Sequence, residues 1–203
     1  MKTEMTDMLA HINMSQNGLK AILSSEFELI WNDRGSGASK DGAFWKPKST
    51  FDTLPIGSLA MSGYGDPDNK YAALCIGPDG LDSKALAHPM KFDLIWADHG
   101  SGADRDGSCW RPIPPNGYVS MGDLFMNGYN GPNLDSVWCV RQDLVEPTSI
   151  GELIWNDKGS GADKDFAAWE INGFHGDSRF SCPFIGNNAH ERPSVTVFKL
   201  KNI

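Results

Sequence analysis

The chain has 203 residues, with 18 Lys and Arg against 26 Asp and Glu, a formal net charge of −8 and 40% hydrophobic residues. This acidic balance excludes a general nucleic-acid-binding protein, because such proteins present a basic surface. The length predicts one domain or two small ones, with a core that needs no disulfide or metal to fold. The 22 Gly, 12 Pro and 7 Trp favour short strands and tight turns over a helical bundle.

No apolar run is long enough for a transmembrane helix, and residues 1–15 lack the apolar stretch of a secretory signal. We therefore expect a cytoplasmic protein, or one released without a conventional signal peptide, with membrane association as a further option. None of the four cysteines has Cys-x-x-Cys spacing, so they are interpreted as free thiols that behave as small hydrophobes. They are Cys75, Cys109, Cys139 and Cys182.

Residues 1–26 precede the first recognisable unit and are treated as an N-terminal extension. Residues 19–24 are expected to add one strand beside the C-terminal strand. Residues 1–16 show weak helical periodicity, which is typical of either a short helix or a segment without structure.

An internal repeat organises the rest of the chain. The sequence Leu-Ile-Trp-x-Asp-x-Gly-Ser-Gly-Ala starts at Leu29, Leu94 and Leu153, and each copy has a second Trp 14 residues after the first. Chance does not produce three such copies. The repeat predicts a single domain over residues 27–203, divided into repeats 27–91, 92–150 and 151–203.

Each repeat contains four apolar runs bounded by Gly, Asn, Asp and Pro, a pattern typical of short strands. They are the Leu-Ile-Trp run, the stretch around the second Trp, a Leu-x-Met run and a Cys-bearing run, whose place is taken in the third copy by residues 195–200. The third copy departs after Trp169 and lacks the Met-x-Gly-Tyr sequence that ends in Tyr64 and Tyr129 in the other two. The pattern predicts an all-β fold of three four-stranded antiparallel sheets around a pseudo-threefold axis, which shields the sheet edges.

The repeated loop Asp-x-Gly-Ser-Gly-Ala-x-x-Asp is the candidate binding element. Its Gly and Asp residues are suited to a structural turn, which is one interpretation. A second is three equivalent sites in which loop N–H groups and side chains bind sugar hydroxyls or an anionic head group. The predicted ligand-binding residues are Asp33, Gly35, Ser36, Gly37, Asp41, Asp98, Gly100, Ser101, Gly102, Asp106, Asp157, Gly159, Ser160, Gly161 and Asp165.

A third interpretation of the same loop is a Ca²⁺ site, because carboxylates are hard oxygen ligands. The spacing is not that of an EF-hand, and each loop carries a basic residue or His after its first Asp and a basic residue before its last. The residues that would bind Ca²⁺ are Asp33, Asp41, Asp98, Asp106, Asp157 and Asp165. No cofactor is required by any other motif.

The sequence provides no support for catalysis. The five His residues do not occupy equivalent positions in the repeats, and no nucleophile elbow, phosphate loop or zinc-spaced His pair is present. We therefore expect a protein that is not an enzyme. Six of the seven Trp residues are repeat pairs and are predicted to form a core, whereas Trp138 has no counterpart.

The middle repeat carries a family resemblance in residues 96–103, Asp106, residues 110–112, 117–122 and 137–141. These segments resemble the vacuolar protein sorting-associated protein 62 family, and the resemblance extends over residues 27–200. That family is similar to the multivesicular-body-associated β-prism and to the C-terminal β-prisms of perforin-like toxins. The resemblance implies a β-prism that binds membranes or surface ligands.

Two functions remain open. The first is a binding module that recognises glycans or lipid head groups at a membrane or cell surface through the three loops. The second is a β-prism component of a larger toxin or protein-sorting assembly, in which a protein partner docks on residues 1–26.

Overall fold

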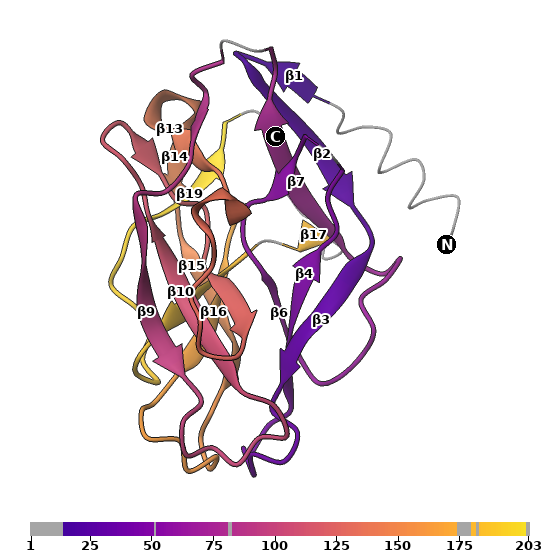
Figure 1. The fold of residues 1–203 in the computed structure, drawn as a ribbon, viewed down its shortest axis with the longest axis vertical. Coiled ribbons are helices and arrows are strands. Elements are labelled where there is room, and N and C mark those ends of the chain that lie inside the picture. The colour runs from indigo at the N-terminus through magenta and orange to yellow at the C-terminus, as the bar shows by residue number, and fades with distance from the viewer. Residues whose placement is uncertain (1–13, 51, 81–82, 174–179, 182, 202–203) are drawn as a thin grey trace.

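A computed structural model describes residues 14–50, 52–80, 83–173, 180–181 and 183–201. Its regular structure consists of short β-strands and two 3-10 turns, η1 (Leu134–Ser136) and η2 (Gln142–Leu144), so the predicted all-β class is confirmed (Figure 1). The strands belong to sheets of two, three and five strands. All but one of the strand pairings are antiparallel.

Three of the sheets have the same construction, with one from each repeat. In each, two long strands form a hairpin around the repeated loop, and a short third strand pairs with the second. The first sheet contains β3 (Phe27–Asn32), β4 (Gly42–Pro47) and β6 (Leu59–Ser62), the second β9 (Lys91–Ala97), β10 (Gly107–Ile113) and β12 (Leu124–Asn127), and the third β15 (Ile150–Asn156), β16 (Ala167–Ile171) and β18 (Phe184–Asn187).

The register of these hairpins explains the Trp spacing. In the first sheet Leu29 pairs with Trp45 and Trp31 pairs with Phe44, so Ile30 is an extra residue in a bulge. The equivalent register shifts recur in the other two hairpins. A bulge bends the strand and re-aims the side chain beside it. The first Trp of every repeat thereby points into a common core.

This core contains the three tryptophans, each 1% exposed, packed edge to face with one another. The residue sizes around them differ between repeats in a compensating way. Phe44 of the first repeat corresponds to Cys109 and Ala168, whereas Phe125 of the second corresponds to Ala60. Close packing requires a fixed total volume, so a large residue in one repeat accompanies a small one in another.

A second set of sheets lies at the other end of the molecule, above the first set in Figure 1. It has its own apolar core, to which Leu19, Leu74, Met121 and Val140 contribute. Its five-stranded sheet contains β1 (Met14–Gln16), β2 (Leu19–Ser24), β5 (Leu54–Pro55), β7 (Ala72–Pro78) and β17 (Phe180–Ser181). A three-stranded sheet contains β8 (Leu86–Ala87), β11 (Tyr118–Val119) and β13 (Cys139–Arg141). In a two-stranded sheet, β14 (Val145–Thr148) pairs with β19 (Val197–Leu200).

Two expectations about strand pairing are wrong. The four runs of a repeat do not form one four-stranded sheet, because the Cys-bearing strands β7 and β13 pair with other short strands at this second end. The strand at residues 19–24 exists as β2, but it pairs with β1 and β7, while the C-terminal strand β19 pairs with β14. Residues 1–16 are expected from the sequence to form a short helix or a segment without structure; residues 14–16 instead form strand β1, and residues 1–13 lie outside the described residues.

Candidate functional site: a ring of three loops

The three repeated loops lie together at the lower end of the molecule in Figure 1, where each follows the first strand of its hairpin. They are joined by backbone hydrogen bonds in cyclic order. The Ser39 amide donates to the Lys158 carbonyl at 2.8 Å, the Asp104 amide to the Arg34 carbonyl at 2.7 Å, and the Asp163 amide to the His99 carbonyl at 2.8 Å. Every loop therefore donates to one neighbour and accepts from the other.

The Gly-Ser-Gly sequence builds the turn within each loop. In the first loop the Ser36 amide donates to the Asp33 carbonyl at 2.9 Å, and the Ser36 hydroxyl accepts from the Ala38 amide at 3.1 Å. Gly35 has a φ of 86°, and a Cβ there would lie 2.6 Å from the Asp104 carboxylate of the next loop. Glycine is thus required both by the backbone conformation and by the approach of the neighbouring loop.

The first Asp of each loop is buried beneath this ring. Asp33, Asp98 and Asp157 are 3%, 3% and 4% exposed. Asp33 accepts hydrogen bonds from the Gly42 amide at 3.1 Å and from the Trp155 indole at 3.2 Å. Asp98 accepts from the Trp31 indole at 3.2 Å through Oδ2, whereas its buried Oδ1 has no hydrogen-bond partner among the described residues. Donors from the protein offset much of the cost of burying these carboxylates, so the side chains hold the loop in place and do not face solvent.

An aromatic side chain, Tyr or His, lies just after the third strand of each sheet and bonds to an Asp of the loop in the same repeat. Tyr64 donates its hydroxyl to Asp33 at 2.7 Å, and Tyr129 donates to Asp106 at 3.0 Å. In the third repeat His190 bonds to Asp157 at 2.7 Å. Burial and the nearby carboxylates raise the pKa of both tyrosines, so they remain protonated donors.

The strand register identifies His190 as the counterpart of the two tyrosines. Trp45 pairs with Leu59, and Trp169 pairs with Ile185; Tyr64 and His190 each follow the paired residue by five positions. The match is not apparent in the sequence alone, because the third copy has two additional residues between its second Trp and His190. The recurrence of Tyr after the second Trp in two copies was the available signal.

Only some of the fifteen predicted ligand-binding residues are exposed on the ring of loops. The second Asp of each loop and both glycines are exposed, whereas the first Asp and the Ser are buried. Because the first Asp bonds to protein donors, the exposed carboxylates are the ones most available to a ligand or to Ca²⁺. The accessible predicted residues are Gly35, Gly37, Asp41, Gly100, Gly102, Asp106, Gly159, Gly161 and Asp165.

Basic side chains border these exposed groups. Lys40, Arg105 and Lys164 are exposed, and no ion pair is formed by them within the described part of the chain. Arg34 lies over the Tyr64 ring at 4.0 Å, and His99 packs on the Tyr129 ring at 3.9 Å. The loop ring therefore brings cations, carboxylates and aromatic side chains together.

The remaining tryptophans are partly buried. Trp45, Trp110 and Trp169 lie on the outer sides of the three sheets, and Trp138 stacks on His88 with ring centroids 3.9 Å apart. The indole N–H groups of Trp45, Trp138 and Trp169 are buried and have no hydrogen-bond partner among the residues that the structure describes. The prediction of a tryptophan core holds fully for the first Trp of each pair and partly for the second.

A buried ion pair outside the loops was not predicted. Arg111 donates from Nε and Nη2 to the Asp123 carboxylate at 2.9 and 2.7 Å, and also to the Gly186 carbonyl at 2.6 Å. Asp123 is 1% exposed and accepts from the Gly186 amide at 2.8 Å. The pair therefore links the second repeat to the third strand of the third.

Three of the cysteines are buried free thiols, as expected, and Cys182 lies outside the described residues. Burial raises the pKa of Cys75 and of Cys139 to about 12, and raises that of Cys109 well above its usual value. Thiols in this state are poor nucleophiles, because the thiolate is the reactive form.

Comparison with known proteins identifies the family. The model of the family "Vacuolar protein sorting-associated protein 62" matches residues 3–202. The chain belongs to this family. The match includes β1 and β2, so the segment treated as an extension lies within the region that the family model matches. No curated protein matches the chain.

A solved structure has the same fold. The crystal structure of GNIP1Aa from Chromobacterium piscinae superimposes with a TM-score of 0.70 at 28% sequence identity. The match covers 96% of this chain but 38% of GNIP1Aa, so the similarity concerns one part of a longer protein. Within the residues described here, no helix is long and apolar enough to cross a membrane.

Proposed function

We propose that this protein is a non-catalytic recognition module that binds glycans or lipid head groups at a membrane or cell surface through its ring of three loops. The module is a β-prism in which the repeats surround a pseudo-threefold axis. The observation that carries the proposal is the closed ring itself, because it brings three copies of the same exposed groups to one end of the molecule.

The ring has the chemistry of a surface for polar ligands. Exposed carboxylates such as Asp41 accept hydrogen bonds from sugar hydroxyls, and the neighbouring Lys40 side chain attracts anionic groups. Three equivalent positions on one surface favour avidity toward a repetitive target. The net charge of −8 opposes general adhesion to anionic lipid, so binding would depend on the ring.

The test removes the exposed cation that precedes the last Asp of each loop, by combined substitution of Lys40, Arg105 and Lys164 to Ala. Their backbone carbonyls accept hydrogen bonds from the core tryptophans, and Ala preserves those carbonyls. Substitution of the first Asp of each loop is unsuitable, because it would remove a buried structural group. Binding is measured on a glycan array and on vesicles of neutral or anionic lipid, with and without Ca²⁺.

The matched control removes three other exposed cations, Lys46, Lys70 and Lys84, and so changes the net charge equally. We expect the ring variant to lose binding at least tenfold and the control to retain it. Equal binding by both variants would exclude the ring. The vesicle and glycan arms distinguish the two ligand sources.

The second candidate is a component of a larger toxin or protein-sorting assembly. The support is that the similar part of GNIP1Aa is 38% of a longer chain. Because β2 is paired on both sides within a sheet, a deletion that tests N-terminal docking must end before Met14. Loss of a partner in a pull-down with ligand binding intact would favour this function.

A further inference from the structure

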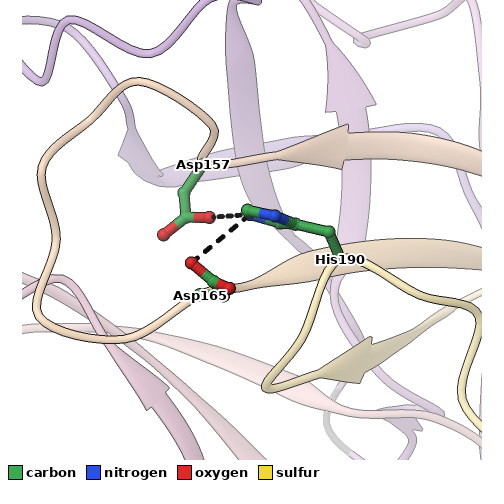
Figure 2. A group of neighbouring side chains, drawn as sticks. All are labelled: Asp157, Asp165 and His190. Carbon is green, nitrogen blue, oxygen red and sulfur yellow. Dashed lines mark hydrogen bonds and ion pairs between the residues drawn. The ribbon is translucent and has the colours of Figure 1, made fainter.

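The third repeat brings together an imidazole and two carboxylates, as Figure 2 shows. His190 Nε2 lies 2.7 Å from Asp157 Oδ1 and 3.9 Å from Asp165 Oδ1. One ligand atom from each residue lies within 4.8 Å of the other two. In the described part of the chain, no other three His, Cys, Asp or Glu residues lie this close together. Asp157 is 4% exposed and Asp165 is 66% exposed at the side chain, so the group lies at the surface with a buried inner wall.

This arrangement is specific to the third repeat. In the first repeat a tyrosine hydroxyl occupies the place of the imidazole, and the indole of Trp155 donates to the buried Asp33. In the third, Trp96 donates to the Lys164 carbonyl, and no bond from it to Asp157 occurs among the described residues. Asp157 therefore has one indole donor fewer than Asp33. Its partner is the imidazole of His190, a side chain that can bind a metal, where Asp33 has a tyrosine hydroxyl.

We propose that Asp157, Asp165 and His190 bind a divalent transition-metal ion, with Zn²⁺ as the best-suited metal. Zn²⁺ accepts imidazole and carboxylate ligands at about 2.0–2.2 Å, which places neighbouring ligand atoms about 3.3 Å apart in a tetrahedron. The two His190 distances lie on either side of that value. The imidazole disfavours Ca²⁺ and Mg²⁺, whose ligands are oxygen atoms.

The site would act as a clamp between two segments. Asp157 and Asp165 are the two ends of the third loop, and His190 lies beyond β18 (Figure 2). A metal bound there fixes the third corner of the loop ring and keeps a coordination position directed to solvent beside the exposed Asp165. The first two corners are closed by tyrosine hydroxyls and need no ion.

The experiment is calorimetric titration of the intact chain with ZnCl₂, combined with Co²⁺ absorption as a report on coordination. We expect one equivalent to bind. His190→Tyr should weaken Zn²⁺ binding at least about tenfold. Mutation of a residue that only hydrogen-bonds to a metal ligand already lowers metal affinity by about that factor, and His190 would be a ligand itself. The variant should keep its unfolding midpoint in EDTA, because tyrosine bonds to the first Asp in the first repeat.

Two further variants keep the test decisive if His190→Tyr does not fold. Asp165→Asn changes an exposed residue and should also lose Zn²⁺ binding, whereas His99→Tyr changes an exposed His in the second loop and should retain it. Absence of Zn²⁺ binding in the unmodified chain would overturn the proposal. Unchanged binding in His190→Tyr or in Asp165→Asn would also overturn it.

Discussion

The indole of Trp155 donates a hydrogen bond to the backbone carbonyl of Lys40 at 2.7 Å, although the two residues are 115 positions apart. Trp155 belongs to the third repeat and Lys40 to the loop of the first. The equivalent bonds run from Trp31 to the Arg105 carbonyl and from Trp96 to the Lys164 carbonyl. Each repeat thus holds the loop of another.

Trp155→Phe should test this relationship, because it retains an aromatic ring and removes the indole N–H. The Lys40 carbonyl and an Asp33 oxygen would lose a donor, and we expect the free energy of unfolding to fall by about 1–3 kcal/mol. Trp45→Phe is the matched control, since the Trp45 indole N–H has no partner within the described part of the chain. Urea denaturation measures both, and equal losses would show that the hydrogen bond contributes nothing.

Gly107→Ala should destabilise the core. A Cβ at Gly107 would lie 2.6 Å from Trp31 and 2.8 Å from Phe125, so one of these rings must move. Overpacking of this kind costs about 1–3 kcal/mol. Gly65→Ala is the control, because the space around it is open and its backbone is not in the left-handed region. A thermal melt in which the two variants behave alike would contradict the packing described here.

Asp123→Ala should destabilise the fold more than removal of an exposed ion-pair partner does. It leaves the Arg111 guanidinium, whose side chain is 23% exposed, without its carboxylate, and we expect a loss below the about 3–5 kcal/mol of a fully buried pair. Asp143→Ala removes an exposed partner of Arg141 and should change stability little. Guanidinium unfolding would show the contrast. A small effect of Asp123→Ala would mean that water reaches the Arg111 guanidinium.

Alkaline pH should destabilise the fold through its buried thiols. The folded pKa of Cys75 and Cys139 is about 12 against an ordinary value of 9.0. A raised folded pKa means that stability is complete below pH 9 and decreases as the pH rises toward 12. Cys75→Ala with Cys139→Ala should flatten this dependence between pH 9 and 11. An unchanged slope would assign the effect to other groups.

The same burial predicts site-specific protection from alkylation. In the folded protein at pH 8, Cys75, Cys109 and Cys139 should resist iodoacetamide, and all three should react in denaturant. Peptide mass spectrometry resolves each site. Rapid labelling of any of the three in the folded state would show that its strand opens.

Much of the fold could be predicted from the repeat, and the reasons for the failures are physical. The paired Trp positions and the Gly-Ser-Gly turns are local signals, so the strands and loops follow from the sequence. Strand pairing is not local. Nothing in residues 19–24 indicates that they pair with β7 rather than with β19.

The site shows the same limit. The repeat predicted that the loops matter, but it could not separate the buried Asp33 from the exposed Asp41, because both lie in the same loop. The role of His190 could not be predicted, because it follows the second Trp of its repeat at a distance two residues longer than Tyr64 and Tyr129 do in theirs. Its equivalence to Tyr64 becomes evident once the strand register is known.

The cyclic order of the loop contacts has a consequence for any shortened form of the protein. One repeat alone would contain a Trp with no loop to hold and a loop with no Trp to hold it. Two repeats would form one of these Trp–loop contacts and would leave one Trp without a loop and one loop without a Trp. An isolated copy would have to leave these groups to water or pair them with other copies, so we expect stable folding to require three copies, on one chain or on three.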